Sequence, residues 1–448
     1  MIHQKRNKFV MNQNIKIFFW SLSASLGGFL FGFDTAVISG VEQTLQKLWE
    51  LNSLEHGVTV SIALIGTVVG SLIGGILADK FGRKKSLFII GILYLLSSLG
   101  TAYAFDWSVF LIFRFMGGLG VGVSSVVAPL YISEIAPAHK RGRLVAMFQF
   151  NIVLGILMAY LSNYFLSGIS ENEWRWMLGV QAFPSLIFTI TVMLIPESPR
   201  WLILQRGDVS TARNILHSID KDAAEQIIVS IQKNTTKVKV VLFQKAYNRP
   251  ILLAVLFAVF NQVSGINAII YFAPRIFEMG GIGKDSALLS SAGIGLMNLI
   301  STLLGISMID HFGRRTLMKV GTVGLILTLI LVSQALFSQQ MSLNVPFYLF
   351  AYISFFGFSQ GAVIWVFISE IYPNEVRANG QALGSFTHWL MASFITFTFP
   401  YFAETFGGGI VFAFFASMMV LQLLFVWKLM PETKGKSLEN MDNIIITH

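Results

Sequence analysis

Twelve apolar segments, each bounded by charged or turn-forming residues, constrain the fold of this chain more than any other feature. Because a helix crosses the hydrocarbon core of a bilayer with roughly 20 apolar residues, each segment is long enough to span a membrane. Composition agrees, since 12% of the 448 residues are charged, against about 25% in soluble proteins. We therefore predict an all-α membrane protein with twelve transmembrane helices. They are expected at about residues 17–41, 57–78, 86–105, 107–133, 144–168, 176–195, 250–274, 286–309, 320–338, 345–369, 378–403 and 405–427.

Basic residues sort strongly by side when the N-terminus is placed in the cytoplasm. Of the 32 Lys and Arg residues, 27 then fall on the cytoplasmic side, and Arg114 lies within a span. The positive-inside rule predicts this asymmetry for an integral membrane protein. We expect a multi-pass protein of the cell (inner) membrane with both termini cytoplasmic and the first apolar segment retained as a span. The net charge of +9 is then explained by the excess of Lys and Arg on the cytoplasmic side of the membrane. We therefore expect no nucleic-acid partner.

Three charged signatures recur in the second half of the chain. DKFGRK at Asp79 returns as DHFGRR 231 residues later, and SEIAPAHKRG returns as SEIYPNEVRANG 236 residues later. PESPR returns as PETKG after 235 residues. Parallel repeats of this kind relate the two halves of some transporters. We predict two pseudo-symmetric six-helix halves at 1–195 and 250–430, joined by a cytoplasmic helical linker at 196–249 and followed by a short tail at 431–448.

The recurring signatures place carboxylates and guanidinium groups together at the cytoplasmic ends of the spans. Such groups can pair and clamp neighbouring helix ends, which predicts a role in conformational locking. The alternative is that they only anchor loops by their charge. The expected pairs are Asp79 with Arg83, Asp310 with Arg314, Glu134 with Arg141 or Arg143, Glu197 with Arg200, and Glu370 with Arg377, and Glu432 completes the set.

The seventh span contains a polar waist, in which Asn261, Gln262, Ser264 and Asn267 surround Gly265. A buried amide without a partner costs roughly 2–7 kcal/mol, so these side chains must face other helices, water or a ligand. A Gly-interrupted helix at mid-membrane depth is typical of transporter binding sites. Hydrogen bonding between helices is the alternative. Gln262 and Asn298 each lie 13 residues from a charged helix end, a depth of about 20 Å, so they can meet at the midplane.

Two formal charges, Asp34 and Arg114, are expected deep within the spans. Each lies eight residues from a charged residue at the outer end of its helix, Glu42 and Asp106 respectively. Both are therefore about 12 Å below the outer surface. Buried charges by default mark proton or ion pathways. Because Arg114 cannot realistically lose its proton, Asp34 is the predicted proton carrier. A permanent structural ion pair that carries no proton is the alternative.

Several motifs resemble those of the sugar porter family of the major facilitator superfamily. They are GGFLFGFDTAVISG, ADKFGRKK, RFMGGLGVG, PESPRW, NQVSGINAIIYFAP, DHFGRR and PETKGK. The resemblance covers nearly the whole chain and is nearest to bacterial proton-coupled hexose and pentose symporters. It implies a monosaccharide site between the halves, with Asp34 as the residue that distinguishes symporters. The implied substrate-binding residues are Gln149, Asn261, Gln262, Asn267, Asn298, Trp365, His388 and Trp389.

Two departures from the family pattern concern helix shape and sugar preference. Ala362 stands where a Pro is usual on the tenth span, and His388 stands where an amide is usual before Trp389. An imidazole can still donate or accept a hydrogen bond, and packing between helices is its alternative role.

Other functional classes fit the sequence less well. No G-x-x-x-x-G-K-[ST] loop is present for an ATP-driven pump, and we expect no enzyme activity, no cofactor and no metal site. A non-transporting sugar sensor on the same scaffold is expected to carry a longer cytoplasmic tail than residues 431–448. We predict proton-coupled symport of a hexose or pentose by alternating access, in a chain that functions as a monomer. A facilitative sugar uniporter is the alternative.

Overall fold

The computed structural model describes residues 13–137, 139–220, 223–233, 242–338, 344–373 and 375–434, and within them the chain forms helices and no strands. Eleven of the described helices are long and apolar enough to cross a membrane by length and composition. The remaining predicted span, 378–403, corresponds to the 30-residue helix α19 (Arg377–Phe406). Its sequence is less apolar because it carries polar residues such as Gln381 and His388. The chain is an integral, multi-pass all-α protein.

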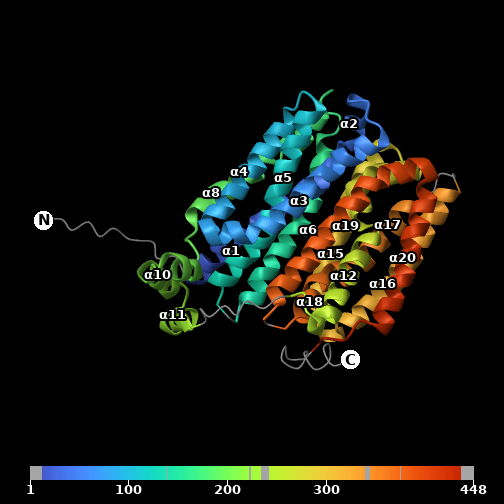
Figure 1. Cartoon of the computed structure of the whole chain (residues 1–448). Coiled ribbons are helices and arrows are strands. Elements are labelled where there is room, and N and C mark those ends of the chain that lie inside the picture. The colour runs from blue at the N-terminus through green and yellow to red at the C-terminus, as the bar shows by residue number, and fades with distance from the viewer. Residues whose placement is uncertain are drawn as a thin grey trace.

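The first group of helices, blue to green in Figure 1, contains the spans predicted before residue 195. Asn52 caps α3 by accepting from the backbone N–H groups of Leu54 and Glu55, and Asp106 caps α5 in the same way through Val109. The elements are α1 (Gln13–Val37), η1 (Ile38–Gly40), α2 (Glu42–Leu48), α3 (Ser53–Phe81), α4 (Arg83–Ala102), α5 (Trp107–Ile135), α6 (Arg141–Leu166), α7 (Glu173–Gly179) and α8 (Ala182–Leu194).

The second group, yellow to red, lies beside the first. Its elements are α12 (Asn248–Val263), α13 (Ile266–Tyr271), α14 (Ala273–Met279), α15 (Lys284–Phe312), α16 (Arg314–Phe337), α17 (Val345–Phe356), η4 (Gly357–Gly361), α18 (Ala362–Glu370), α19 and α20 (Gly408–Lys428). The two groups meet along their length, because α19 packs against α3 and α15 packs against α6. A site between the halves is therefore bounded by these four helices.

Close helix packing within the first group depends on small residues. A Cβ atom added to Gly118 on α5 would overlap the backbone carbonyl of Ala63 on α3. Small residues allow such close backbone approach between membrane helices. The helices α3 and α5 consequently pack closely together, and α5 carries Arg114.

Between α8 and α12 the chain forms short helices at one end of the molecule. They are α9 (Pro199–Trp201), η2 (Leu202–Arg206), α10 (Val209–Ile219), α11 (Ala224–Lys233) and η3 (Lys245–Tyr247). Trp201, Leu216 and Ile228 form a small apolar core of their own beneath the spans. These helices lie at the same end as the described C-terminal residues, whereas α2 lies at the opposite end (Figure 1).

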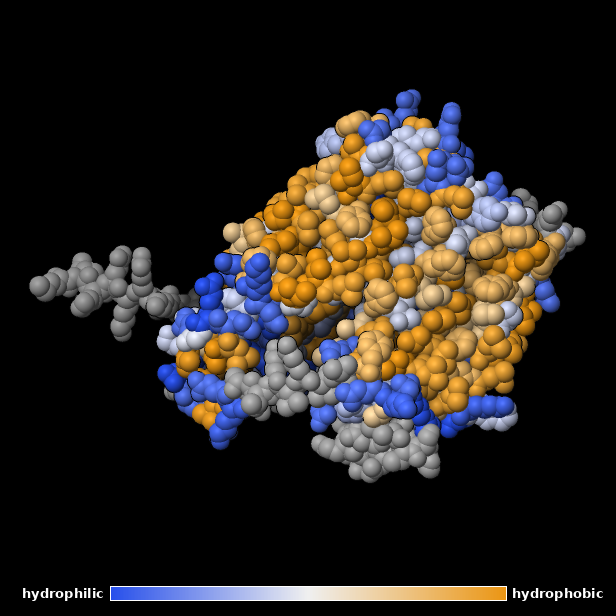
Figure 2. Space-filling view, viewed as in Figure 1, coloured by the Kyte–Doolittle hydropathy of each residue, from blue (hydrophilic) through white to orange (hydrophobic). Residues whose placement is uncertain are grey.

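The surface of the spans is apolar around the middle of the molecule. Figure 2 shows hydrophobic residues in a broad band between two polar ends. Exposed apolar residues of the spans include Leu72, Ile76, Leu186, Leu304 and Leu327. Because lipid tails surround a membrane protein at this depth, such a band fits a bilayer and not water.

Candidate functional site

The predicted polar waist of the seventh span is a break in the helix. Residue Gly265 has a φ of 87°, in the left-handed region, and separates α12 from α13. A residue with a Cβ adopts this conformation only at a cost, which is why glycine stands here. The hydroxyl of Tyr352 donates to the carbonyl of Ser264 at 2.9 Å. A side chain of the neighbouring helix α17 thus hydrogen-bonds the carbonyl of Ser264, which lies at the helix break.

Gln262 is the centre of the buried amide cluster. Its Oε1 accepts a hydrogen bond from Nδ2 of Asn267 at 2.7 Å, and its Nε2 donates to Oδ1 of Asn261 at 2.9 Å. Nε2 also lies 3.2 Å from each ring nitrogen of His388, so it can donate to whichever nitrogen carries no proton. All four side chains are at least 91% buried. The structure therefore brings together four of the predicted substrate-binding residues from α12, α13 and α19.

Aromatic rings enclose the imidazole of His388. The ring centre of Trp365 lies 4.9 Å from the centre of the imidazole. The ring centre of Trp389 lies 4.8 Å from it, and these two rings meet edge to face. Trp389 also contacts Phe31 of α1 at 5.4 Å between ring centres, so it reaches the other half. Its indole N–H is buried and has no hydrogen-bond partner among the described residues. A buried donor of this kind can serve a ligand oxygen.

Gln149 and Asn298 lie on helices that face each other across the two halves. Gln149 is half-buried on α6, and Asn298 is buried on α15, where its Oδ1 accepts from Thr302 at 3.4 Å. The helices α6 and α15 are in contact. Trp365 is the most exposed of the predicted substrate-binding residues, with 37% of its surface accessible.

The tenth span, in which Ala362 replaces the usual Pro, is interrupted just before this residue. Residues Gly357–Gly361 form a π-helical turn between α17 and α18. Single π-turns interrupt the regular hydrogen-bond ladder and occur frequently at functional sites. The regular helix of the tenth span is thus interrupted directly before Ala362, although no Pro stands there.

Asp34 and Arg114 form a buried ion pair in the first group of helices. Nη1 of Arg114 donates to Oδ1 of Asp34 at 2.9 Å, and each side chain is 2% exposed. Gln181, between α7 and α8, donates to the same carboxylate oxygen at 3.4 Å. Nε of Arg114 has no hydrogen-bond partner among the described residues. Asp34 and Arg114 are thus paired in the structure, as their equal predicted depth in the membrane indicates.

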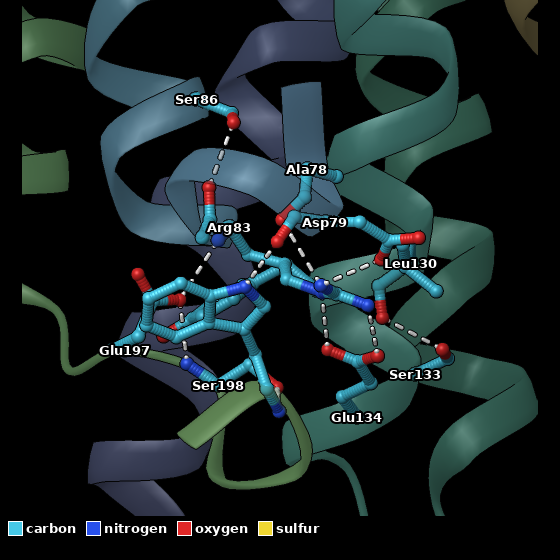
Figure 3. Close-up of polar contacts among 12 residues, drawn as sticks. Ala78, Asp79, Arg83, Ser86, Leu130, Ser133, Glu134, Glu197 and Ser198 are labelled. Carbon is cyan, nitrogen blue, oxygen red and sulfur yellow. Dashed lines mark hydrogen bonds and ion pairs between the residues drawn. The ribbon is translucent and has the colours of Figure 1, made fainter. Parts of the chain in front are cut away.

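Arg83 is the centre of a polar cluster at the end of the first group that carries the short helices (Figure 3). Its guanidinium donates to both carboxylate oxygens of Glu134, at 2.9 and 3.0 Å, and to Asp79 at 3.2 Å. Its backbone N–H donates to Glu197 at 2.8 Å. Glu197 also accepts from the N–H of Lys84, so its carboxylate caps the N-terminus of α4.

Arg314 repeats this arrangement in the second group. It donates to both oxygens of Glu370, at 2.8 and 3.1 Å, and to Asp310 at 3.0 Å. Its backbone N–H and that of Arg315 each donate to Glu432 at 3.0 Å, which caps α16. Each residue of the Arg83 cluster therefore has a counterpart in the Arg314 cluster. The hydrogen bonds of each cluster join helix ends within one group of helices.

Three of the expected clamp pairs are replaced by other partners. Glu134 binds Arg83 and not Arg141, which is exposed at the start of α6. Glu197 accepts from backbone N–H groups of α4, and Arg200 is exposed. Glu370 binds Arg314, while Arg377 donates to the carbonyl of Tyr372 at 3.1 Å. The carboxylates reach helix ends distant in sequence because a helix N-terminus and a bidentate guanidinium stabilise them better than an exposed arginine does.

The profile of the family described as Sugar (and other) transporter matches residues 20–445. This match covers nearly all of the chain. The chain belongs to this sugar transporter family.

Individual relatives within the family agree in length and fold. The D-xylose-proton symporter of Escherichia coli strain K12 is 36% identical over 471 residues, covering 95% of each chain. The arabinose-proton symporter of Bacillus subtilis strain 168 is 34% identical, covering 95% of this chain and 94% of the relative. The inward-open conformation of the E. coli xylose transporter superposes with a TM-score of 0.85 at 33% identity, covering 96% and 100%. The structure therefore has the major facilitator fold of sugar transporters.

This sugar transporter carries two polar features that sequence reasoning missed. The first is Gln181, which has no charge to mark it and lies in a turn. The second is a cluster of Glu42, His56 and Arg275, in which the carboxylate and imidazole have no exposed surface. The charge of Glu42 predicts the outer end of the first span at the membrane surface, whereas the structure buries this side chain. Among the described residues, no group of three or more His, Asp or Glu side chains is placed to hold a metal ion.

Proposed function

We propose that this protein is a proton-coupled symporter that carries a monosaccharide, a hexose or a pentose, by alternating access. The observation that carries the proposal is the buried ion pair of Asp34 and Arg114 in a chain with a separate amide site. Transported protons need a titratable group within the spans, and Asp34 is the member of the pair that can accept one. The names of the xylose and arabinose symporters support the same function.

The proposed sugar site consists of Gln262, Asn261, Asn267, His388 and Trp389, with Gln149, Asn298 and Trp365 on the surrounding helices. Each amide offers both a donor and an acceptor, as sugar hydroxyls do. The unpaired indole N–H of Trp389 supplies a further donor, and its ring can cover the C–H face of a pyranose. Without sugar, the amides satisfy one another through Gln262.

The end that carries Arg83 and Arg314 is proposed to be cytoplasmic, because the basic residues gather there. We place the protein in the cell membrane with both termini inside, and with halves at 1–195 and 250–430, a linker at 196–249 and a tail at 431–448. The likeness to an inward-open transporter supports a conformation closed at the outer end. Because one chain carries both halves of the site, the proposed functional unit is a monomer.

Reconstitution into proteoliposomes tests this function. A panel of hexoses and pentoses is offered with and without an inward proton gradient, and external pH is recorded during uptake. A symporter concentrates its sugar only when the gradient is present, and sugar addition makes the external medium more alkaline. A facilitative uniporter equilibrates sugar equally in both conditions without a pH change.

A further inference from the structure

Glu42, His56 and Arg275 form a compact ionic cluster at the end of the molecule far from Arg83 and Arg314. Nε and Nη2 of Arg275 donate to the two carboxylate oxygens of Glu42 at 3.0 and 2.9 Å. Nε2 of His56 lies 2.6 Å from Oε2 of the same carboxylate. The carboxylate of Glu42 therefore lies against three nitrogen atoms from two residues, which belong to different helices.

The cluster connects the two halves of the proposed transporter. Glu42 begins α2 and His56 lies on α3, both in the first group, whereas Arg275 lies on α14 in the second. Its helix α14 follows α13, which carries Asn267 of the proposed sugar site, and only Phe272 separates the two. A displacement of this segment thus acts on both the ionic cluster and the amide site.

Burial makes the contact between Glu42 and Arg275 sensitive to opening. Glu42 and His56 are fully buried, and Arg275 is 22% exposed. The ring centre of Phe272 lies 5.9 Å from that of His56 and 4.9 Å from that of Phe399, so aromatic side chains pack against the cluster. Burial alone raises the pKa of Glu42, but Arg275 and His56 outweigh it and hold the pKa below its ordinary value. The carboxylate is accordingly charged in this conformation, and a charge so buried needs its partners.

We propose that Glu42, His56 and Arg275 form a latch that holds the outer ends of the two halves together, and that it must release before the sugar site opens outward. The proposal rests on the alternating access proposed above. Because the bidentate contact of Glu42 with Arg275 exists only when the two halves meet, it stabilises the outward-closed state selectively. Weakening it shifts the population toward the outward-open state.

The chain contains no cysteine, so a single introduced thiol reports the opening directly. Ser39 is 2% exposed and lies in η1, which contacts α13 and α14. Ser39→Cys in the otherwise unchanged chain is labelled with a membrane-impermeant maleimide added outside. Glu42→Gln keeps the shape of the side chain and removes its charge. We expect it to raise the initial labelling rate about tenfold or more, since removing one partner of a buried ion pair is strongly destabilising.

Arg275→Gln is the second variant, and its partly exposed position makes it the more tolerant substitution. Arg275→Gln should raise the labelling rate of Ser39→Cys about as much as Glu42→Gln does. The double variant Glu42→Gln/Arg275→Gln should be labelled little faster than either single variant, because all three lose the same contact between Glu42 and Arg275. Tyr103→Cys, at a residue that is 79% exposed, calibrates reagent access in each background and should not respond.

Glu173→Gln is the matched control. Glu173 on α7 pairs with Lys284 on α15 at 2.8 Å, so it also joins the two halves, but Lys284 is 57% exposed. Exposed ion pairs contribute little to the stability of a conformation. In the Glu173→Gln background, the labelling rate of Ser39→Cys should therefore change by less than about twofold. Unchanged labelling in Arg275→Gln overturns the latch, whether or not Glu42→Gln folds. Since labelling requires neither sugar nor a proton gradient, failure of symport leaves this test intact.

Discussion

Gln262 accepts a 2.7 Å hydrogen bond from Asn267 across the helix break at Gly265. The two amides thus hold each other in place before any sugar arrives. A site built this way is partly preorganised, which reduces the ordering cost of binding. The same contact gives the first prediction.

Replacing Gln262 or Asn267 by Ala should weaken sugar binding while the protein remains folded. One well-formed hydrogen bond in a dry site contributes about 1–3 kcal/mol, which corresponds to as much as a hundredfold in affinity. Equilibrium binding of the best monosaccharide to purified protein measures the change. Gln205→Ala is the control, because Gln205 is exposed on the linker. Wild-type affinity in both site variants would place the sugar elsewhere.

Substitution of Gly265 by Ala tests the helix break itself. The left-handed φ of 87° costs a residue with a Cβ about 1–2 kcal/mol, and the added carbon would press on the ring of Phe415. We expect a lower Tm and weaker sugar binding. Gly283→Ala is the matched control, since Gly283 has a φ of −65° and open space around it. Equal Tm values for the two variants would contradict the assigned role of Gly265.

His388 should influence which sugar is preferred. It lies 3.2 Å from the Nε2 of Gln262 and between two tryptophan rings, where the family resemblance implies an amide. His388→Gln should change the ranking among hexoses and pentoses in a competition assay, because the pattern of donors and acceptors changes. A ranking that stays the same, with normal uptake, would assign His388 to packing.

Arg83 and Arg314 should affect turnover more than affinity. Both lie at the helix ends, away from the amides, and each makes a bidentate contact with a glutamate. Ala substitution of either is expected to slow uptake without changing the sugar Kd by as much as tenfold, or about 1.4 kcal/mol. Arg141→Ala, at an exposed residue of the same face, should transport normally. Normal uptake with a tenfold poorer Kd in Arg83→Ala would contradict this division of roles.

Features with a regular period or a repeated spacing could be predicted from the sequence. The apolar segments gave the spans, and counting residues from charged ends gave the shared depth of Asp34 and Arg114. Partners on separate helices could not be predicted in this way. Glu134 binds Arg83, 51 residues upstream, although Arg141 is nearer in the chain. The charge of Glu42 ends the first apolar segment and so predicts a surface position, but tertiary packing buries Glu42 with His56 and Arg275.

The proposed proton-coupled symport by this protein depends on protonation of Asp34, and Asp34→Asn removes the group that is protonated. The amide preserves the size of the side chain and can still accept from Arg114, but it cannot be protonated at working pH. In proteoliposomes with an imposed inward proton gradient, we predict that Asp34→Asn loses sugar accumulation and retains sugar binding and counterflow exchange. Accumulation by Asp34→Asn that follows the pH gradient at the wild-type level would exclude Asp34 as the proton carrier.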